Sequence, residues 1–277
     1  MNIKYKGKMV YEIIKEDNVI GHIYGVNLSR LDYSDENDLN EYISRIKEII
    51  DGDEYKYIYI EESLPLNIKK IIADNLSINL SDSKDIKMDN IPYIIEALKS
   101  KLKRDIIKEE ILIISNNKDE VLWIIDSISD GLNFLSVLGL NDSDGEDVYE
   151  RVLDDIGISI YFPKAKSITL KRYGLIINTI DDISINLKDI KNNTFIIDFS
   201  QARPFAGVNR YVIEDVSIDI SDLAINDNLW IGKEVSSDLY KCLDDKDSRK
   251  FCRIYKSDNL FTMEDLVNQS FKIKGGY

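Results

Sequence analysis

The sequence is poor in several residues on which protein chemistry often depends. Its 277 residues include two cysteines, four prolines and one histidine. Two cysteines are too few for a disulfide framework, and Cys242 and Cys252 do not form a CxxC motif. A zinc site is excluded because these few sulfur and imidazole ligands lie at unrelated places. We therefore expect reduced thiols and no bound metal.

The chain also lacks long apolar runs and an excess of positive charge. No apolar stretch approaches the roughly 20 residues that a membrane-spanning helix needs, and no apolar segment follows the basic residues near the N-terminus as in a signal peptide. The 50 acidic residues outnumber the 36 lysines and arginines, which gives a formal net charge of −14. This charge opposes docking on nucleic acids and on anionic lipids. We expect a cytoplasmic protein that binds neither nucleic acid nor membranes.

What the sequence does contain is typical of a globular protein. Apolar residues make up 44% of the chain and charged residues 31%, a composition that excludes wholesale disorder. Isoleucine is common and alanine scarce, which indicates an AT-rich coding bias and hence a bacterial source. A chain of this length is long enough to form one large domain or two modest domains, with a sizeable hydrophobic core.

The first part of the chain, residues 1–105, has the pattern of an α/β domain. The expected elements are two strands, a helix, a strand and two helices, at residues 9–17, 19–26, 34–52, 55–62, 65–75 and 90–103. The first helix has one apolar stripe, and the strand at 55–62 alternates polar and apolar residues.

From residue 106 the pattern changes to an alternation of strands and helices. Continuous apolar runs, typical of strands buried on both faces, occur at residues 111–114, 132–138, 158–162, 175–179 and 194–199. Helix candidates fill the first two gaps, whereas the gap before the fourth strand requires a short or irregular crossover. Such an alternation predicts a parallel sheet with right-handed crossovers. We expect a Rossmann-like domain over 106–220 and a mixed helical tail over 221–277 that packs on the rest.

This layout of an α/β domain, a Rossmann-like unit and a helical tail resembles the shikimate dehydrogenase family. The stretch "YGLIINT" at 173–179 is similar to the fourth strand of that family, and "NTFIIDFS" at 193–200 is similar to the fifth. The resemblance covers roughly half of the chain and rests on layout rather than on a specific motif. It implies the fold and, in the family, NAD(P)-dependent oxidation and reduction.

The motif that binds the dinucleotide is missing. It reads G-x-G-x-x-G, because the chain must turn tightly, approach the pyrophosphate and pack helix on strand. Here "SNNKDE" follows the first strand, so the three glycine positions fall on Ser115, Asn117 and Glu120. Asn117 could adopt the left-handed conformation, but Asp119 and Glu120 place negative charge where a pyrophosphate would bind. We expect no conventional dinucleotide binding and no cofactor, and the family's catalytic lysine context is also missing.

Other motifs that carry chemistry are absent as well. The chain has no Gly-x-Ser-x-Gly elbow and no P-loop, and His22 is expected as a half-buried residue of a strand. The segment "LNDSDGEDVYER" at 140–151 has Leu140 and Arg151 where a calcium loop requires acidic ligands. The acidic pair and phospho-accepting aspartate of a receiver domain are not found either.

Polar residues follow several of the predicted strands. The carboxyl ends of parallel strands meet at one edge of a sheet, where open α/β sheets bind ligands. We therefore expect a polar rim there. Arg203 could clamp a carboxylate or phosphate, or it could pair with a nearby acid. The candidate ligand cleft comprises Ser115, Asn116, Asn117, Asn178, Thr179, Asp198, Ser200 and Arg203.

Three functions remain open. The first is a non-catalytic binding, regulatory or assembly role for a degenerate Rossmann-like domain, with a protein partner or a second copy of the chain. The second is an NAD(P)-dependent oxidoreductase with an atypical cofactor turn. The third is a module that binds a small anion through Arg203.

Overall fold

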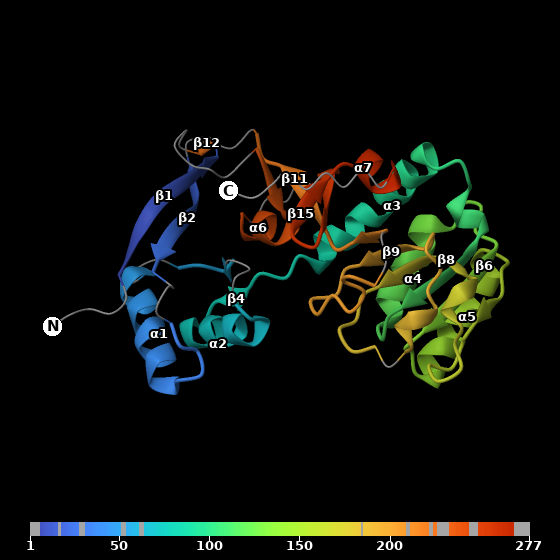
Figure 1. The fold of residues 1–277 in the computed structure, drawn as a ribbon, viewed down its shortest axis with the longest axis horizontal. Helices are drawn as coiled ribbons and strands as arrows, with labels where there is room; N and C mark the ends of the chain where they lie inside the picture. The colour runs from blue at the N-terminus through green and yellow to red at the C-terminus, as the bar shows by residue number, and fades with distance from the viewer. Residues whose placement is uncertain are drawn as a thin grey trace. The chain divides into compact units, whose positions relative to one another are not determined.

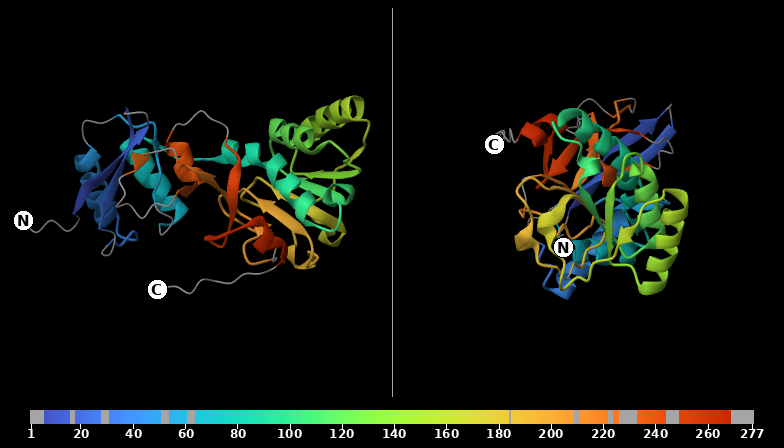
Figure 2. Two further views of the ribbon diagram at one scale, coloured as in Figure 1. Left: turned by 90° about the horizontal axis from the view of Figure 1, so that it is seen from above. Right: turned by 90° about the vertical axis from the view of Figure 1, so that its right-hand side faces the viewer.

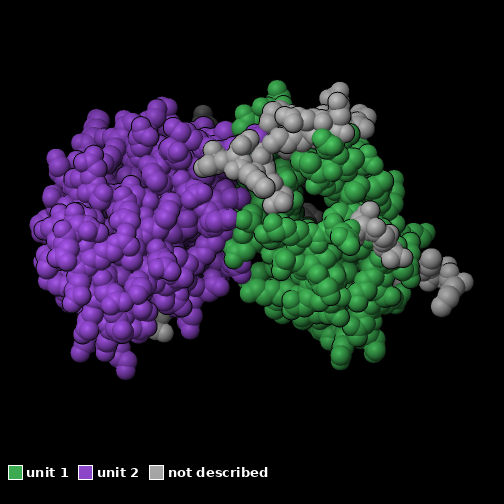
Figure 3. Space-filling view, turned by 180° about the vertical axis from the view of Figure 1, so that it is seen from behind, with its two compact units in different colours: residues 1–83, 219–247 green, residues 84–218, 248–277 purple. Residues whose placement is uncertain are grey.

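The structure is a computed structural model. It describes residues 6–15, 18–27, 31–50, 54–60, 64–183, 185–208, 211–221, 224–225, 233–243 and 249–268. The chain forms two compact units, each built from two stretches (Figure 3): residues 1–83 with 219–247 form unit 1, and residues 84–218 with 248–277 form unit 2. These units do not coincide with the three consecutive parts expected from the sequence: residues 84–105 of the first part belong to unit 2, and the last part is divided between the two units.

Unit 1 is an α/β structure. Its antiparallel sheet has the order β12-β1-β2, and β3 and β4 form a short parallel pair. Apolar residues three and four positions apart on α1, Leu39, Tyr42 and Ile43, face Leu64 and α2 in one core cluster. The elements are β1 (Gly7–Lys15), β2 (Asn18–Val26), α1 (Glu36–Ile50), β3 (Tyr57–Ile58), α2 (Leu66–Leu76), β4 (Asn79–Leu80), β12 (Ala224–Ile225), β13 (Glu234–Ser236) and α6 (Ser237–Cys242).

Unit 2 contains the alternating strands and helices expected from the sequence. Its α and β elements are α3 (Lys84–Lys101), β5 (Glu110–Ile114), α4 (Lys118–Ile128), β6 (Phe134–Leu138), α5 (Asp142–Asp155), β7 (Ile160–Tyr161), β8 (Tyr173–Asn178), β9 (Phe195–Asp198), β10 (Val212–Ile213), β11 (Asp215–Asp219), β14 (Phe251–Lys256), β15 (Asn259–Phe261) and α7 (Met263–Asn268). None of the helices described in either unit is long and apolar enough to cross a membrane.

The six-stranded sheet of unit 2 is parallel throughout. Its order is β10-β9-β8-β5-β6-β7, and every pair of neighbours runs in the same direction. Numbered from β5, this is the order 6-5-4-1-2-3 of a Rossmann fold, in which the chain changes direction across the sheet between the first and fourth strands. The predicted α/β class with a Rossmann-like parallel sheet is confirmed, and its switch point lies between β5 and β8.

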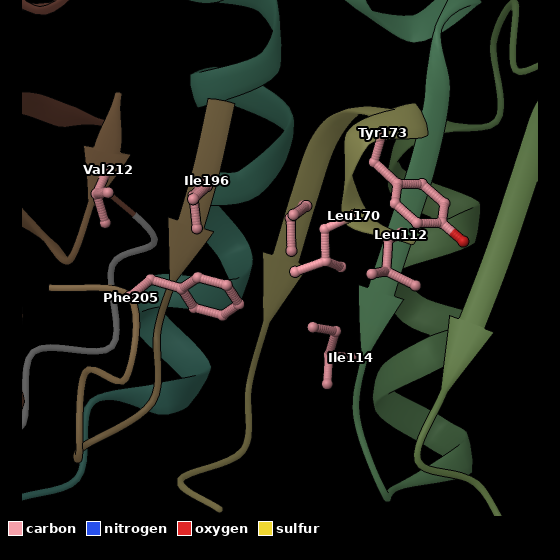
Figure 4. Packing of buried hydrophobic residues seen from close by; sticks show 8 residues of the cluster. Leu112, Ile114, Leu170, Tyr173, Ile196, Phe205 and Val212 are labelled. Carbon is pink, nitrogen blue, oxygen red and sulfur yellow. The ribbon is translucent and has the colours of Figure 1, made fainter. Parts of the chain in front are cut away.

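The central strands are buried on both faces. All six residues of β8 are buried, as are Ile111–Ile114 of β5. Helices α4 and α5 lie side by side on one face (Figures 1 and 2). Figure 4 shows the apolar cluster on the other face, where Phe205 from the loop after β9 and Leu170 pack against strand residues such as Leu112, Ile176 and Ile196.

The crossovers on that second face are irregular. The described residues between β7 and β8 and between β8 and β9 contain only the 3-10 turns Leu170–Arg172 and Leu187–Asp189. The short or irregular crossover predicted before the fourth strand is therefore confirmed. Partly buried apolar residues of these loops, among them Ile183, Ile185 and Leu187, cover the sheet in place of a helix.

The C-terminal part of unit 2 adds an antiparallel layer. Strand β11 follows β10 almost at once and pairs with β14, which forms a hairpin with β15. The tail that we expected to be mixed thus contains the β14–β15 hairpin as well as the short helices α6 and α7. The turn of this hairpin, Ser257–Asp258, has both residues in the left-handed region, with φ of 47° and 59°.

Gly139, which follows β6, gives the first prediction. Its φ is +114°, and a Cβ atom there would lie 2.6 Å from the carbonyl oxygen of Ser115. We expect Gly139→Ala to lower the free energy of unfolding by about 2–4 kcal/mol in urea denaturation, since backbone strain and a backbone clash add. Gly131→Ala is the matched control: φ is +83°, but no heavy atom lies within 4 Å of the added Cβ. It should lose only about 1–2 kcal/mol, and equal losses would show that the close approach is unimportant.

Candidate functional site

The switch point brings two hydroxyl groups together. Ser115 follows β5 and Thr179 follows β8. The N–H of Thr179 donates to the carbonyl oxygen of Ile114 at 3.0 Å, and the N–H of Ser115 donates to that of Leu138, also at 3.0 Å. The sheet ladder thus continues past the strand ends and fixes the backbone of both residues. Ser115 and Thr179 are buried.

The carboxylate of Glu120 occupies the space beside these hydroxyls. Its Oε2 accepts hydrogen bonds from Ser115 Oγ and Thr179 Oγ1, each at 2.9 Å. Its Oε1 lies 2.6 Å from Lys84 Nζ, at the start of α3, and only 19% of the Glu120 side chain is exposed. An anion held by two hydroxyls and an ammonium group therefore lies at the switch point, and that anion belongs to the protein itself.

The N-terminus of α4 is capped from within. The Oδ1 atom of Asn117 accepts the N–H groups of Asp119 and Glu120, at 2.9 and 3.2 Å. Asn117 is extended, with φ of −117° and ψ of 119°, so the left-handed conformation considered from the sequence is wrong. An Ncap residue needs this extended backbone for its side chain to reach the N–H groups two and three residues on. The donors that bind phosphate at such a helix N-terminus are thus used by Asn117.

The end of β6 also differs from a dinucleotide site. An NAD-binding fold places an acidic residue about 20 residues after the glycine turn to hydrogen-bond the ribose. Here β6 ends at Leu138 and is followed by Gly139 and Leu140. Because Gly139 has no side chain, the backbone there passes close to the backbone of Ser115.

A second polar group, centred on Asp198, lies at the end of β9. The buried Oδ1 of Asp198 accepts from Asn178 Nδ2 at 2.7 Å and from Ser200 Oγ at 2.6 Å. Its Oδ2 accepts the N–H of Phe205 at 3.1 Å. Because a buried carboxyl group needs hydrogen-bond partners, these contacts fix the loop from 198 to 205. Asp198 therefore has a structural role, because its hydrogen bonds hold this loop.

A third group joins Arg203 to two acids. Arg203 Nη1 lies 2.6 Å from Asp258 Oδ1 and 3.9 Å from Glu214 Oε2. Glu214 follows β10 and is 1% exposed, and its Oε2 also accepts the N–H of Ser257 at 2.7 Å. Burial raises the pKa of the Glu214 carboxyl, although the Ser257 N–H and Arg203 oppose the rise. Arg203 is therefore paired with nearby acids, one of the two alternatives weighed from the sequence.

The residues of the predicted cleft thus divide into separate groups at one edge of the sheet. Ser115 and Thr179 meet at Glu120, whereas Asn178 and Ser200 meet at Asp198. Arg203 joins the second group through its N–H, which donates to Ser200 Oγ at 3.2 Å. Asn117 caps α4, and Asn116 is exposed. Their role as a ligand cleft stays a prediction.

The sequence did not point to Lys84, Glu214 or Asp258 as parts of these groups. Lys84 opens a helix that precedes the first strand, and Asp258 lies in a hairpin turn far along the chain. No local pattern connects either of them to the switch point or to Arg203. Of the three, only Glu214 could have been identified from the sequence, because it directly follows a pair of apolar residues that comes after the fifth predicted strand.

Other candidate chemical groups have structural surroundings. His22, half-buried on β2 as expected, lies 2.8 Å through Nδ1 from Tyr55 Oη, which lies 2.6 Å from Tyr24 Oη. Burial raises the pKa of the Cys242 thiol to about 11, which keeps it protonated at neutral pH. Within the ranges that the structure describes, no group of three or more histidine, cysteine, aspartate or glutamate residues could hold a metal ion.

Comparison with known proteins adds a likeness of fold. No protein-family model matches the sequence, and no curated protein matches it. Similar solved structures include a dipicolinate synthase from Bacillus halodurans, with 16% identity and a TM-score of 0.38 over 56% of this chain and 55% of that chain. They also include shikimate 5-dehydrogenase from Listeria monocytogenes, with 13% identity and a TM-score of 0.33 over 44% and 45%.

Quinate dehydrogenase from Corynebacterium glutamicum is a third similar structure, with 7% identity and a TM-score of 0.34 over 49% of each chain. The part of the chain that matches covers about half the length of these proteins. These similar structures agree with the expected resemblance in layout to the shikimate dehydrogenase family. Likeness at this level says nothing about activity.

The Glu120 cluster gives the second prediction. Glu120→Ala removes the acceptor of both hydroxyls and the partner of Lys84, so we expect the free energy of unfolding to fall by about 1–3 kcal/mol in urea. Asp119→Ala, at the exposed neighbouring acid, should cost no more than about 1 kcal/mol through the helix dipole. Similar small losses in both variants would mean that Glu120 contributes only as a first-turn acid.

Glu214 gives the third prediction, which concerns pH. Because its pKa is raised on folding, the folded chain binds this proton more tightly than the unfolded chain does. The contribution of Glu214 to stability is therefore lost as pH rises from its ordinary pKa through the raised one. We expect Glu214→Gln to gain stability relative to the parent as pH rises above the ordinary pKa of a glutamate, followed by urea denaturation at a series of pH values. Glu146→Gln, at an exposed position of α5, should show no such gain.

Proposed function

We propose that this chain has a non-catalytic binding, regulatory or assembly role, built on a Rossmann-like domain that does not bind a dinucleotide in the conventional way. The observation that carries the proposal is the Glu120 carboxylate at the switch point, with Ser115, Thr179 and Lys84 as its partners. A dinucleotide binds with its pyrophosphate at this place in a Rossmann fold.

The electrostatics of the switch point support the proposal. A pyrophosphate would approach a carboxylate that is mostly buried, and like charges in a partly desolvated site repel each other strongly. Two N–H groups that could attract a phosphate, those of Asp119 and Glu120, donate to Asn117, and the Lys84 ammonium binds Glu120. The ribose-binding acid has no counterpart at the end of β6. Together these features support the proposal that the chain does not bind a dinucleotide in the conventional way.

The alternative is an NAD(P)-dependent oxidoreductase with an atypical cofactor turn. It would require Glu120 to leave Ser115 and Thr179, and Lys84 to turn from Glu120 to a phosphate. The strand order and the names of the similar structures favour this alternative. Both observations concern the fold alone, however, and folds of this type host many functions.

The fourth prediction is that nicotinamide cofactors do not bind the full chain. We expect no shift in the thermal unfolding midpoint with NAD, NADH, NADP or NADPH at millimolar concentration. A ligand at about 100 times its dissociation constant would stabilise the protein by about 2.7 kcal/mol, which raises the midpoint by several degrees. Equilibrium dialysis with NADH fluorescence gives an independent measurement.

Saturable binding of any of the four cofactors, or turnover that depends on NAD(P)H, would overturn the proposal and establish the oxidoreductase alternative. The Glu120→Ala chain separates two reasons for a negative result. If it binds NADH and the parent does not, the carboxylate alone blocks the site. If neither binds, the missing glycine turn and the capped helix are sufficient. The oligomeric state of the parent, from light scattering, then directs the search toward a second copy or another protein partner.

A further inference from the structure

A second place in unit 2 has features of a ligand site, and it is separate from the switch point. Four non-glycine residues in the described part of the chain have positive φ, and three of them, Arg203, Ser257 and Asp258, meet here, with φ of 48°, 47° and 59°. Non-glycine residues in this region are strained, and such strain concentrates at binding sites. The three residues surround Glu214 at the carboxyl end of β10.

Glu214 supplies the second and independent observation. Its side chain is 1% exposed, and its Oε1 atom has no hydrogen-bond partner in the part of the chain that the structure describes. Only Oε2 is engaged, by the N–H of Ser257 at 2.7 Å and by Arg203 Nη1 at 3.9 Å. A buried carboxylate oxygen without a donor is unfavourable, and the described residues leave this acceptor unsatisfied.

Asp258 binds Arg203 from the solvent side. The Asp258 side chain is 67% exposed, whereas that of Arg203 is 25% exposed. Ion pairs with an exposed partner contribute little to stability, because water and salt screen them. A carboxylate from outside the chain could therefore replace Asp258 at Arg203 with little loss. Glu214 cannot be displaced in the same way, since it is held in the interior between β10 and β11.

We propose that Arg203 and Glu214 form a binding site for a small amino acid, in which Asp258 takes the place of the ligand carboxylate when the site is empty. The ligand carboxylate binds the Arg203 guanidinium, and its ammonium group donates to Glu214 Oε1. The two protein charges are close, so they match a ligand whose opposite charges lie on neighbouring atoms. The hairpin turn at Ser257–Asp258 moves aside as the ligand binds. This goes beyond the proposed function and does not depend on nucleotide binding.

The chemistry of Arg203 and Glu214 determines which ligands the site prefers. Arginine recognises carboxylates in a fork of parallel hydrogen bonds, so a simple carboxylic acid satisfies only half of the site. An ammonium group next to the carboxylate adds a charge-assisted hydrogen bond to Glu214. It also favours the ionised form of Glu214, whose pKa burial raises in the empty site. At a pH between the ordinary and the raised pKa of Glu214, binding of an amino acid therefore releases protons, whereas binding of a carboxylic acid does not.

The test is a titration of the full chain with L-alanine, and with propionate as the matched ligand that lacks the ammonium group, followed by ligand-observed NMR at constant ionic strength. We expect saturable binding of L-alanine about tenfold tighter than that of propionate, as one charge-assisted hydrogen bond implies. Calorimetry in two buffers of different ionisation enthalpy should show proton release with L-alanine only.

Three variants assign the contacts. Asp258→Asn removes the competing carboxylate and should tighten binding about two- to fivefold. Arg203→Lys keeps the charge without the fork and should weaken binding about tenfold. Glu214→Gln should abolish the preference for L-alanine over propionate. Arg172→Ala is the control, because Arg172 is also an arginine paired with an acid, Glu110, but lies outside this site.

Absence of saturable L-alanine binding to both the parent and Asp258→Asn, each with a cooperative unfolding transition, would overturn the inference. So would binding that Arg203→Lys and Arg172→Ala weaken equally. Equal affinity for L-alanine and propionate would show an anion site at Arg203 without a role for Glu214, and would therefore contradict the proposed ligand class. None of these results bears on the nicotinamide experiment, so the two proposals fail separately.

Discussion

The burial of β5, β8 and β9 on both faces is the constraint on which the rest of unit 2 depends. Strands covered on both sides have no face on which to carry a polar side chain, and here the residues are almost entirely isoleucine, leucine, valine and aromatic. The buried polar groups of the sheet therefore lie at the last residues of these strands, such as Asn178 and Asp198, or just past the strand ends. Because all six strands are parallel, those ends lie along one edge, and the groups at Glu120, Asp198 and Glu214 follow from that geometry.

The three acids show three different ways to accommodate a carboxyl group in a folded chain. Glu120 has an ammonium group and two hydroxyls, and remains partly exposed. Asp198 is fully buried and relies on neutral donors, so its loop is determined by hydrogen bonds rather than by a cation. Glu214 is equally buried, but among the residues that the structure describes one of its oxygens has no donor. Two of the three acids are thus accounted for by structure alone, and the third is the one whose surroundings call for a partner from outside.

The fold was more predictable than the site because its determinants are local. A run such as Ile111–Ile114 indicates a buried strand wherever it occurs, and strands joined by helices indicate a parallel sheet. The helix expected at 90–103 begins earlier, at Lys84, and continues through Pro92. The sequence could not show this, since proline favours a helix start and tertiary contacts decide how far the helix extends. Site partners such as Lys84 and Asp258 come from remote segments, and no periodicity connects them to Glu120 or Arg203.

The division of each unit into two stretches has a consequence for synthesis on the ribosome. Unit 1 needs residues 219–247, and unit 2 needs residues 248–277, in addition to their earlier segments. Chains emerge from the N-terminus and domains fold as units, so neither unit can be completed until its own late stretch has left the exit tunnel. Strand β11 in particular is synthesised before its partner β14, so the edge that pairs with β14 stays unpaired until β14 has been made. Unpaired strand edges can pair with other chains, so the interval between the synthesis of these two strands exposes the nascent protein to aggregation.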